Sequence, residues 1–151
     1  MNERNFPQKR KSSVNPEEGW RSEVEKFLGK DFVQRVLDFH DLEIEEFKDF
    51  NNKIQKFVED IANNITTSSL RKIYDLIKNS EDASDLVFKL PYMVYMVGKE
   101  KDAKREALGK LYIALKDPIE NIKDERQVRN IKKFAEALVA YQKLYGGKEE
   151  R

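Results

Sequence analysis

Apolar residues recur along most of this chain at the three- and four-residue spacings of amphipathic helices. The pattern is clearest in residues 66–78, where the apolar and aromatic positions between Leu70 and Ile77 form one stripe that must be buried. Thr66 or Thr67 stands before the stripe, and either side chain can accept hydrogen bonds from the free N–H groups of a first helical turn. The sequence therefore predicts a capped helix that runs to about Asn79.

Similar periodicities predict four more long helices and a shorter helical region before them. The long helices are expected at residues 43–63, 84–98, 103–116 and 124–145. Residues 20–39 are expected to form one or two short helices interrupted at Gly29. Asp117-Pro118 should stop the fourth long segment, and Gly146-Gly147 should end the last one.

The segment 84–98 is apolar on nearly every side. A helix of that composition lies either at the centre of a bundle or in a contact between subunits. Pro91 is expected to kink this helix or to begin it after a break at Leu90, and Gly98 is a natural C-terminal cap.

These patterns predict an all-α fold, a compact bundle of about five helices with a flexible basic N-terminal tail. We expect a tail at residues 1–19, one domain at 20–146 and a flexible C-terminus at 147–151. Charged residues make up 38% of the 151 positions, with only 6 Gly and 4 Pro, a composition typical of helical proteins. No segment has the pattern of a β-strand.

Charge is unevenly distributed although the net charge is only +1. Residues 12–64 carry seven basic and thirteen acidic side chains, whereas residues 65–151 carry eighteen basic and fourteen acidic ones. This polarity favours an anionic partner on one side of the molecule, or head-to-tail stacking of copies. The absence of cysteine, of a signal-peptide pattern and of an apolar run of about 20 residues leads us to expect a cytoplasmic protein without a membrane contact.

The sequence offers no persuasive catalytic site. His40 is the only histidine and has no evident triad partners, and one histidine makes a poor metal site. The acidic clusters at residues 41–46 and 81–85 are expected to cap and charge helix starts rather than to bind Mg²⁺. There is no Gly-rich phosphate loop. We therefore expect no enzyme, no cofactor and no metal.

Basic side chains are better placed to bind a ligand. They lie on the 66–78 helix, between the third and fourth long helices, and at helical spacing along one face of the last helix. The candidate RNA-binding residues are Arg71, Lys72, Lys78, Lys99, Lys104, Arg105, Arg126, Arg129, Lys132 and Lys133. Such groups bind phosphates without reading bases, so the binding would be independent of sequence and sensitive to salt.

Three segments, in this order and at this spacing, resemble the small subunit of type III-A CRISPR effector complexes, the Csm complexes. The first is Thr-Thr-Ser-Ser-Leu-Arg-Lys-Ile-Tyr at residues 66–74. The second, at 90–99, resembles the family's Leu-x-Pro plus Ala-Tyr-x-x-Gly-Arg pattern, with Val94 in place of the small residue and Lys99 in place of the arginine. The third, at 134–141, is close to Phe-x-Glu-Ala-x-Val-Ala-Tyr. The resemblance covers residues 44–145.

The resemblance implies a non-enzymatic helical subunit that acts in antiviral defence. Several copies would stack along the guide RNA paired with target RNA, beside other Csm subunits, and would contact the backbone rather than the bases. Arg71, Lys72 and Lys99 are the RNA contacts that the motifs themselves suggest. The candidates between residues 126 and 133 are inferred only from their spacing along one helix face.

Two other kinds of protein remain open from the sequence. One is a homodimeric interaction module in which the apolar helix pairs through Tyr92, Met93, Tyr95 and Met96, without nucleic acid. On the same helix, Tyr92 and Tyr95 are expected to pack in the core more readily than to stack on bases. The other is a helix-turn-helix DNA regulator whose recognition helix would begin at residues 66–71. The long helix expected before it argues against that motif.

Overall fold

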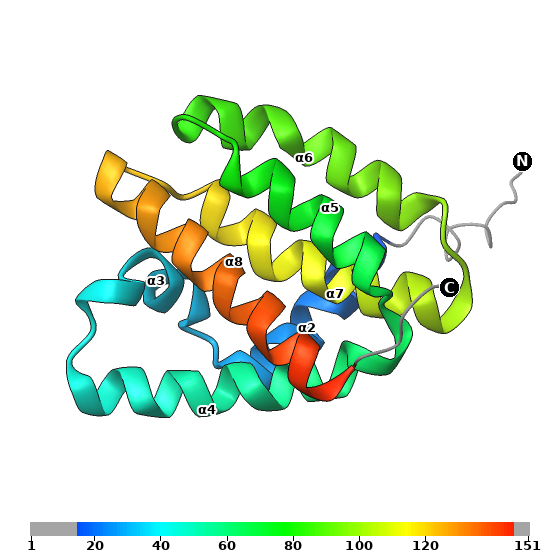
Figure 1. Cartoon of the computed structure of the whole chain (residues 1–151), viewed down its shortest axis with the longest axis horizontal. Helices are drawn as coiled ribbons and strands as arrows, with labels where there is room; N and C mark the ends of the chain where they lie inside the picture. The colour runs from blue at the N-terminus through cyan, green and yellow to red at the C-terminus, as the bar shows by residue number, and fades with distance from the viewer. Residues whose placement is uncertain (1–14, 147–151) are drawn as a thin grey trace, which may run out of the picture.

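The computed structural model describes residues 15–146, and within them it is entirely helical (Figure 1). The α-helices are α2 (Pro16–Leu28), α3 (Phe32–Leu37), α4 (Ile44–Ile61), α5 (Thr67–Lys78), α6 (Ala83–Gly98), α7 (Asp102–Ile119) and α8 (Glu125–Tyr145), with 3-10 turns η1 (Phe39–Asp41) and η2 (Ala62–Asn64). The predicted all-α class is confirmed. The expected number of helices is too low, because residues 16–37 form two separate helices that both contribute to the core.

Helix α2 begins inside the segment predicted as a tail. The Oδ1 atom of Asn15 accepts a hydrogen bond from the backbone N–H of Glu17 at 2.9 Å, and Pro16 occupies the first helical position. An N-cap asparagine followed by proline is a favourable helix start. Residues 16–19 are therefore helical, while residues 1–14 and 147–151 lie outside the described part of the chain.

Three other predicted helix ends are confirmed, whereas Gly98 is the last residue of α6 and its C-cap is Lys99. The hydroxyl of Thr66 accepts a hydrogen bond from the N–H of Ser69 at 3.0 Å and starts α5. Gly29 ends α2 with a φ of 99°, which a residue with a Cβ adopts only under strain. Gly146 is the C-cap of α8.

Pro91 does not begin α6 after a break at Leu90, and Pro118 does not stop α7. Helix α6 continues through Pro91, and α7 continues through Pro118 to Ile119. Pro91 lies on the exposed side of α6, where water can satisfy the carbonyl that loses its helical donor. Pro118 lies in the last turn of α7, where few hydrogen bonds remain to be lost.

Helix α7 occupies the centre of the bundle, and α6 lies at its edge (Figure 1). The residues of α7 from Leu111 to Leu115 are all buried, and the helix contacts α2, α3, α4, α6 and α8. The sequence had left α6 either central or in a subunit contact. The central position is excluded, since Phe88, Tyr92 and Tyr95 on α6 are more than 60% exposed.

Helix α2 meets α7 at a glycine. A Cβ atom added to Gly109 would lie 2.3 Å from the indole Cε2 of Trp20, so the indole rests directly on the helix backbone. The indole N–H donates to Glu106 Oε1 at 3.0 Å. Beside this contact, Arg21 donates to both carboxylate oxygens of Asp117, at 2.6 and 2.8 Å. The glycine thus allows α2 to close one side of the core.

We expect Gly109→Ala to lower the free energy of unfolding by about 1–3 kcal/mol, because the added methyl group must displace a buried indole. Gly19→Ala on α2 is the control: nothing lies within 4 Å of its added Cβ, so the change should stabilise the protein by about 0.5–1 kcal/mol. Urea denaturation of both variants measures the difference. Equal stability of the two variants would contradict the close contact.

Candidate nucleic-acid interface

Helices α5 and α8 lie side by side and run in opposite directions (Figure 1). At one end of the pair, Thr67 and Gln142 line the same hollow. At the other end, the Nζ atom of Lys132 donates to the backbone carbonyl of Ser80 at 2.6 Å. The apolar stripe of α5 is buried as predicted, with Leu70, Ile73 and Ile77 in the core. The basic side chains of α5 are consequently held at the surface.

The two helices enclose a shallow depression, which we call the α5–α8 groove. Its volume is about 350 Å³. The lining residues are Thr67, Leu70, Arg71, Tyr74, Asp75, Lys78, Val139, Gln142 and Lys143. Arg71 and Lys78 were predicted as candidates. The sequence analysis missed Lys143. Its position could have been found, because residues 133, 136, 140 and 143 follow one another at helical spacing and so share one face of α8.

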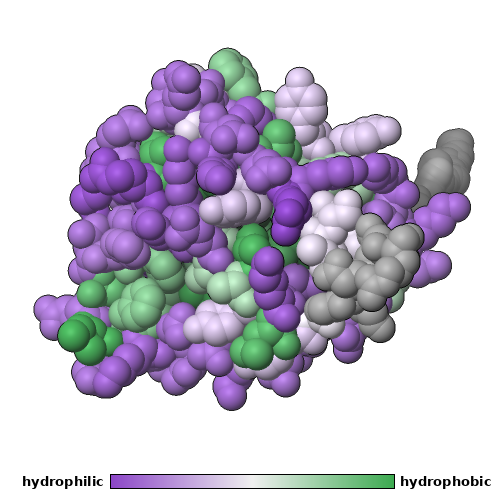
Figure 2. Space-filling model, viewed as in Figure 1, coloured by the Kyte–Doolittle hydropathy of each residue, from purple (hydrophilic) through white to green (hydrophobic). Residues whose placement is uncertain are grey.

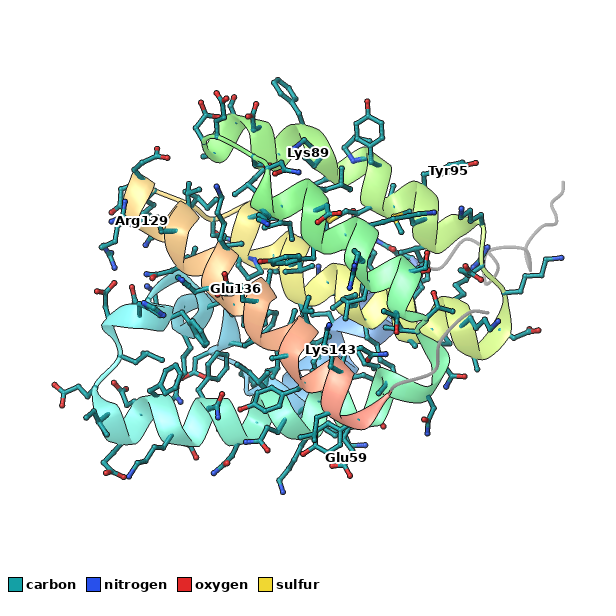
Figure 3. The ribbon with its side chains drawn as sticks, in the orientation of Figure 1. Glu59, Lys89, Tyr95, Arg129, Glu136 and Lys143 are labelled. Atoms are coloured by element: carbon teal, nitrogen blue, oxygen red, sulfur yellow. The ribbon has the colours of Figure 1, made fainter. Side chains whose placement is uncertain are left out.

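Further cations extend the groove along α8. Arg129 and Lys133 are exposed, and Figure 3 shows Arg129, Glu136 and Lys143 in a row along this helix. From Arg129 to Lys143 the helix rises about 21 Å at about 1.5 Å per residue. Glu136 interrupts the row, since its carboxylate lies 3.5 Å from both Lys133 Nζ and the hydroxyl of Tyr74.

Three of these cations have no ion-pair partner among residues 15–146. Arg71, Arg129 and Lys143 form no ion pair with any residue of the described range 15–146. Lys78 lies with its Nζ 5.9 Å from the ring centre of Tyr74. The α5–α8 groove, together with the part of α8 that extends it, therefore offers at least three guanidinium or ammonium groups to an anionic ligand.

A second group of predicted cations lies on the other side of α5. Lys72 and Lys104 line a polar hollow at the N-terminus of α5, together with Glu100. Lys99 lies over the ring of Tyr95, with Nζ 5.8 Å from its centre. The guanidinium of Arg105 donates to the carbonyls of Gly98 and Glu100 at 2.9 and 3.1 Å, so it closes the end of α6. The structure does not unite this group with the α5–α8 groove.

Two predicted candidates have hydrogen-bond partners within the described part of the protein. Arg126 donates to Asp41 across 85 sequence positions and also approaches Asp38 at 3.7 Å and Asp124 at 3.8 Å. Hydrogen bonds from Asn130 and Arg126 hold the pKa of Asp41 below its usual value. The ammonium group of half-buried Lys132 donates a hydrogen bond to the carbonyl of Ser80. We therefore remove both residues from the proposed ligand surface.

Acidic residues near α6 have structural partners. The carboxylate of Asp82 caps α6 by accepting from the N–H of Asp85 at 2.9 Å, and Asp85 accepts from the N–H of Glu81 at 2.9 Å. No group of three or more His, Cys, Asp or Glu side chains suited to a metal ion occurs among residues 15–146. No helix in that part of the chain is long and apolar enough to cross a membrane.

The predicted interface on α6 is only partly available. Tyr92 and Tyr95 are 64% and 68% exposed, which rules out core packing for both rings, and Met96 is half-buried. Met93 is fully buried and belongs to the core-facing side of α6 with Leu86, Leu90 and Val97, so its place in an interface was wrongly predicted.

These features define a small all-helical protein with a basic groove on one face. Comparison with known proteins adds the family. The Csm2 Type III-A family model matches residues 41–148. A protein of Streptococcus thermophilus described as "CRISPR system Cms protein Csm2" is 33% identical over 95 residues, which cover 56% of this chain and 76% of that protein. The chain therefore belongs to the Csm2 family, and it is a small subunit of a type III-A CRISPR complex.

The family match confirms the resemblance drawn from the three motifs. It leaves out residues 1–40, as the motifs did. No solved structure matched the chain.

Lys132 and Lys133 are adjacent, yet they should behave differently. Lys132→Ala removes the donor from the carbonyl of buried Ser80 and should lower the free energy of unfolding by about 1 kcal/mol. Lys133→Ala removes an exposed side chain and should change it by less than about 0.5 kcal/mol. Chemical denaturation measures both. A larger loss from Lys133→Ala would show that the structural lysine has been misassigned.

The stability that Arg126 contributes through its ion pair with Asp41 should depend on pH. A carboxylate with a lowered pKa stabilises the fold at neutral pH, and that stabilisation is lost as the pH falls through the pKa of the folded state. Arg126→Gln should therefore lower the melting temperature at pH 7. The difference from the unaltered chain should shrink below pH 3.8, the ordinary pKa of the Asp41 carboxyl. A difference that stays constant down to pH 2 would exclude Asp41 as the partner that matters.

Proposed function

We propose that this chain is a non-catalytic subunit that binds the RNA backbone through the α5–α8 groove. The observation that carries the proposal is the row of cations along two antiparallel helices, of which Arg71, Arg129 and Lys143 have no ion-pair partner among the described residues. Phosphates attract such groups regardless of base sequence. Guide-directed complexes need this property, because each guide RNA has a different sequence.

Several copies of the chain stack along the guide RNA and its target, beside other Csm subunits, in the cytoplasm and in antiviral defence. Family membership supports the partnership with Csm subunits. The charge distribution supports stacking, because residues 12–64 are net acidic and residues 65–151 net basic. The groove of each copy supplies one segment of a continuous basic track. The second cluster, at Lys72, Lys99 and Lys104, contacts RNA that extends past α5.

The groove can be tested by reversing charge on both of its helices. Arg71→Glu with Lys133→Glu should weaken binding of RNA by about tenfold or more at fixed salt, equally for unrelated RNA sequences. The slope of log affinity against log salt should fall by about two, since two phosphate contacts are lost. Fluorescence anisotropy with labelled RNA measures both quantities.

The control reverses two exposed cations on α4, Lys48→Glu with Lys56→Glu, which changes the net charge by the same amount. It should leave most of the affinity intact if the groove is the binding site. Equal losses from both double variants would show that only overall charge matters. Binding should be measured on the isolated chain and on the assembled complex, because stacked copies present more of the track.

A further inference from the structure

A buried side-chain amide lines the α5–α8 groove. It belongs to Gln142 on α8, which is only 2% exposed. The Nε2 atom donates to the backbone carbonyls of Ala62 and Ile65, at 3.3 and 3.0 Å. Because carbonyl oxygens only accept, these two bonds use both donors of the amide and fix which of its atoms is Oε1. No residue in the range 15–146 donates a hydrogen bond to that oxygen.

The Oε1 atom of Gln142 therefore needs a donor from outside the described residues. Buried acceptors without a partner are rare in native proteins, because leaving one unpaired is costly. A second hollow beside Gln142 has a volume of only about 10 Å³ and is otherwise lined by apolar residues of the core. It lies at the lower size limit for a water molecule and lacks the polar partners that a water needs. Of these two hollows, the α5–α8 groove has the room for a donor.

The amide is held in a fixed position. Ala62 and Ile65 precede α5, so Gln142 connects the two helices that form the groove. A Cβ atom added to Gly146 would lie 2.4 Å from Nε2 and 2.9 Å from Cδ of Gln142, so the backbone of this glycine rests directly on the amide. An acceptor held in this way loses little conformational entropy when it binds a ligand.

The cations beside Gln142 indicate which donor it meets. Arg71 and Lys143 line the same groove, and both attract phosphates. Phosphates themselves only accept hydrogen bonds, whereas the ribose 2′-hydroxyl is a backbone donor that RNA has and DNA lacks. Each 2′-hydroxyl lies on a sugar that is joined to a phosphate, so one nucleotide can engage a cation and Oε1 together. A DNA backbone in the groove would exclude water from Oε1 without replacing its hydrogen bond.

We propose that Oε1 of Gln142 accepts a hydrogen bond from a ribose 2′-hydroxyl and thereby makes the α5–α8 groove select RNA over DNA. This inference rests on the proposed function, because it requires the RNA backbone to lie in the groove. It adds a selectivity that the cations do not provide, since the phosphates of RNA and DNA attract them alike. Gln142 recognises the sugar and not the base, so every guide sequence is accepted equally.

Replacement of the 2′-hydroxyl by fluorine tests the inference. The substitution removes the donor and keeps an RNA-like sugar conformation. The full chain should bind an RNA duplex about fivefold more tightly than the same duplex with 2′-fluoro sugars, the effect of one hydrogen bond. Gln142→Met keeps the length of the side chain without its acceptor, and it should bind both duplexes equally. Fluorescence anisotropy at fixed salt measures the four affinities.

Lys143→Ala is the control, because it removes a cation of the same groove and leaves the amide in place. It should weaken the binding of both duplexes by the same factor and keep the preference for the 2′-hydroxyl. Gln142→Met also removes two hydrogen bonds from the fold, so circular dichroism must show that it folds. Where it does not fold, Gly146→Ala takes its place, since the added methyl group displaces the amide without changing its chemistry.

Equal binding of the two duplexes by the unaltered chain would overturn the inference. The same conclusion would follow from a preference that persists in folded Gln142→Met, or in Gly146→Ala where that variant replaces it. Failure of the proposed function looks different. In that case Arg71→Glu with Lys133→Glu would leave the affinity for RNA unchanged, whatever the sugar.

Discussion

The structure depends on the burial of α7 from Ala107 to Ile119. Helices can surround α7 closely because small residues, Ala107, Gly109 and Ala114, lie among its larger buried side chains. At Gly109 the indole of Trp20 rests directly on the helix backbone. The Arg21–Asp117 hydrogen bonds hold the same two helices together at the surface. With α2 and α3 packed on one part of α7, the remaining helices form the side that carries the functional groups (Figure 1).

The proposed function depends on the side chains that the helices keep at the surface when their apolar stripes are buried. One apolar stripe of α5 is buried in the core, and the helix packs between α6 and α8. Its two remaining sides therefore have different neighbours. Toward α8 the edge is basic and polar, and toward α6 it lies beside exposed tyrosines. Figure 2 shows mostly hydrophilic residues over this side of the molecule, with a few apolar patches. A single helix thus separates the α5–α8 groove from the exposed aromatic face of α6.

Local chemistry was predicted well from the sequence, and long-range contacts were not. The Thr66 cap, the buried stripe of α5 and the stop at Gly29 depend on residues a few positions apart. The partners of Arg126 and Lys132, Asp41 and Ser80, are 85 and 52 positions away in the sequence. The local pattern does not show such partners, so both residues were assigned to the ligand surface. The possible central position of α6 was wrong for a related reason. The density of apolar residues on α6 exceeds that on α7, but small residues on α7 allow closer packing, which the apolar pattern does not reveal.

The central claim is that the α5–α8 groove touches RNA in the assembled complex. The most direct measurement places a photo-crosslinking amino acid at Asp75, inside the groove, or at Glu59, on the outer face of α4 (Figure 3), and isolates the irradiated complex from its native host. The account predicts that position 75 cross-links to guide or target RNA at many different sequences and that position 59 does not. RNA cross-linked at position 59 and absent at position 75 would contradict it.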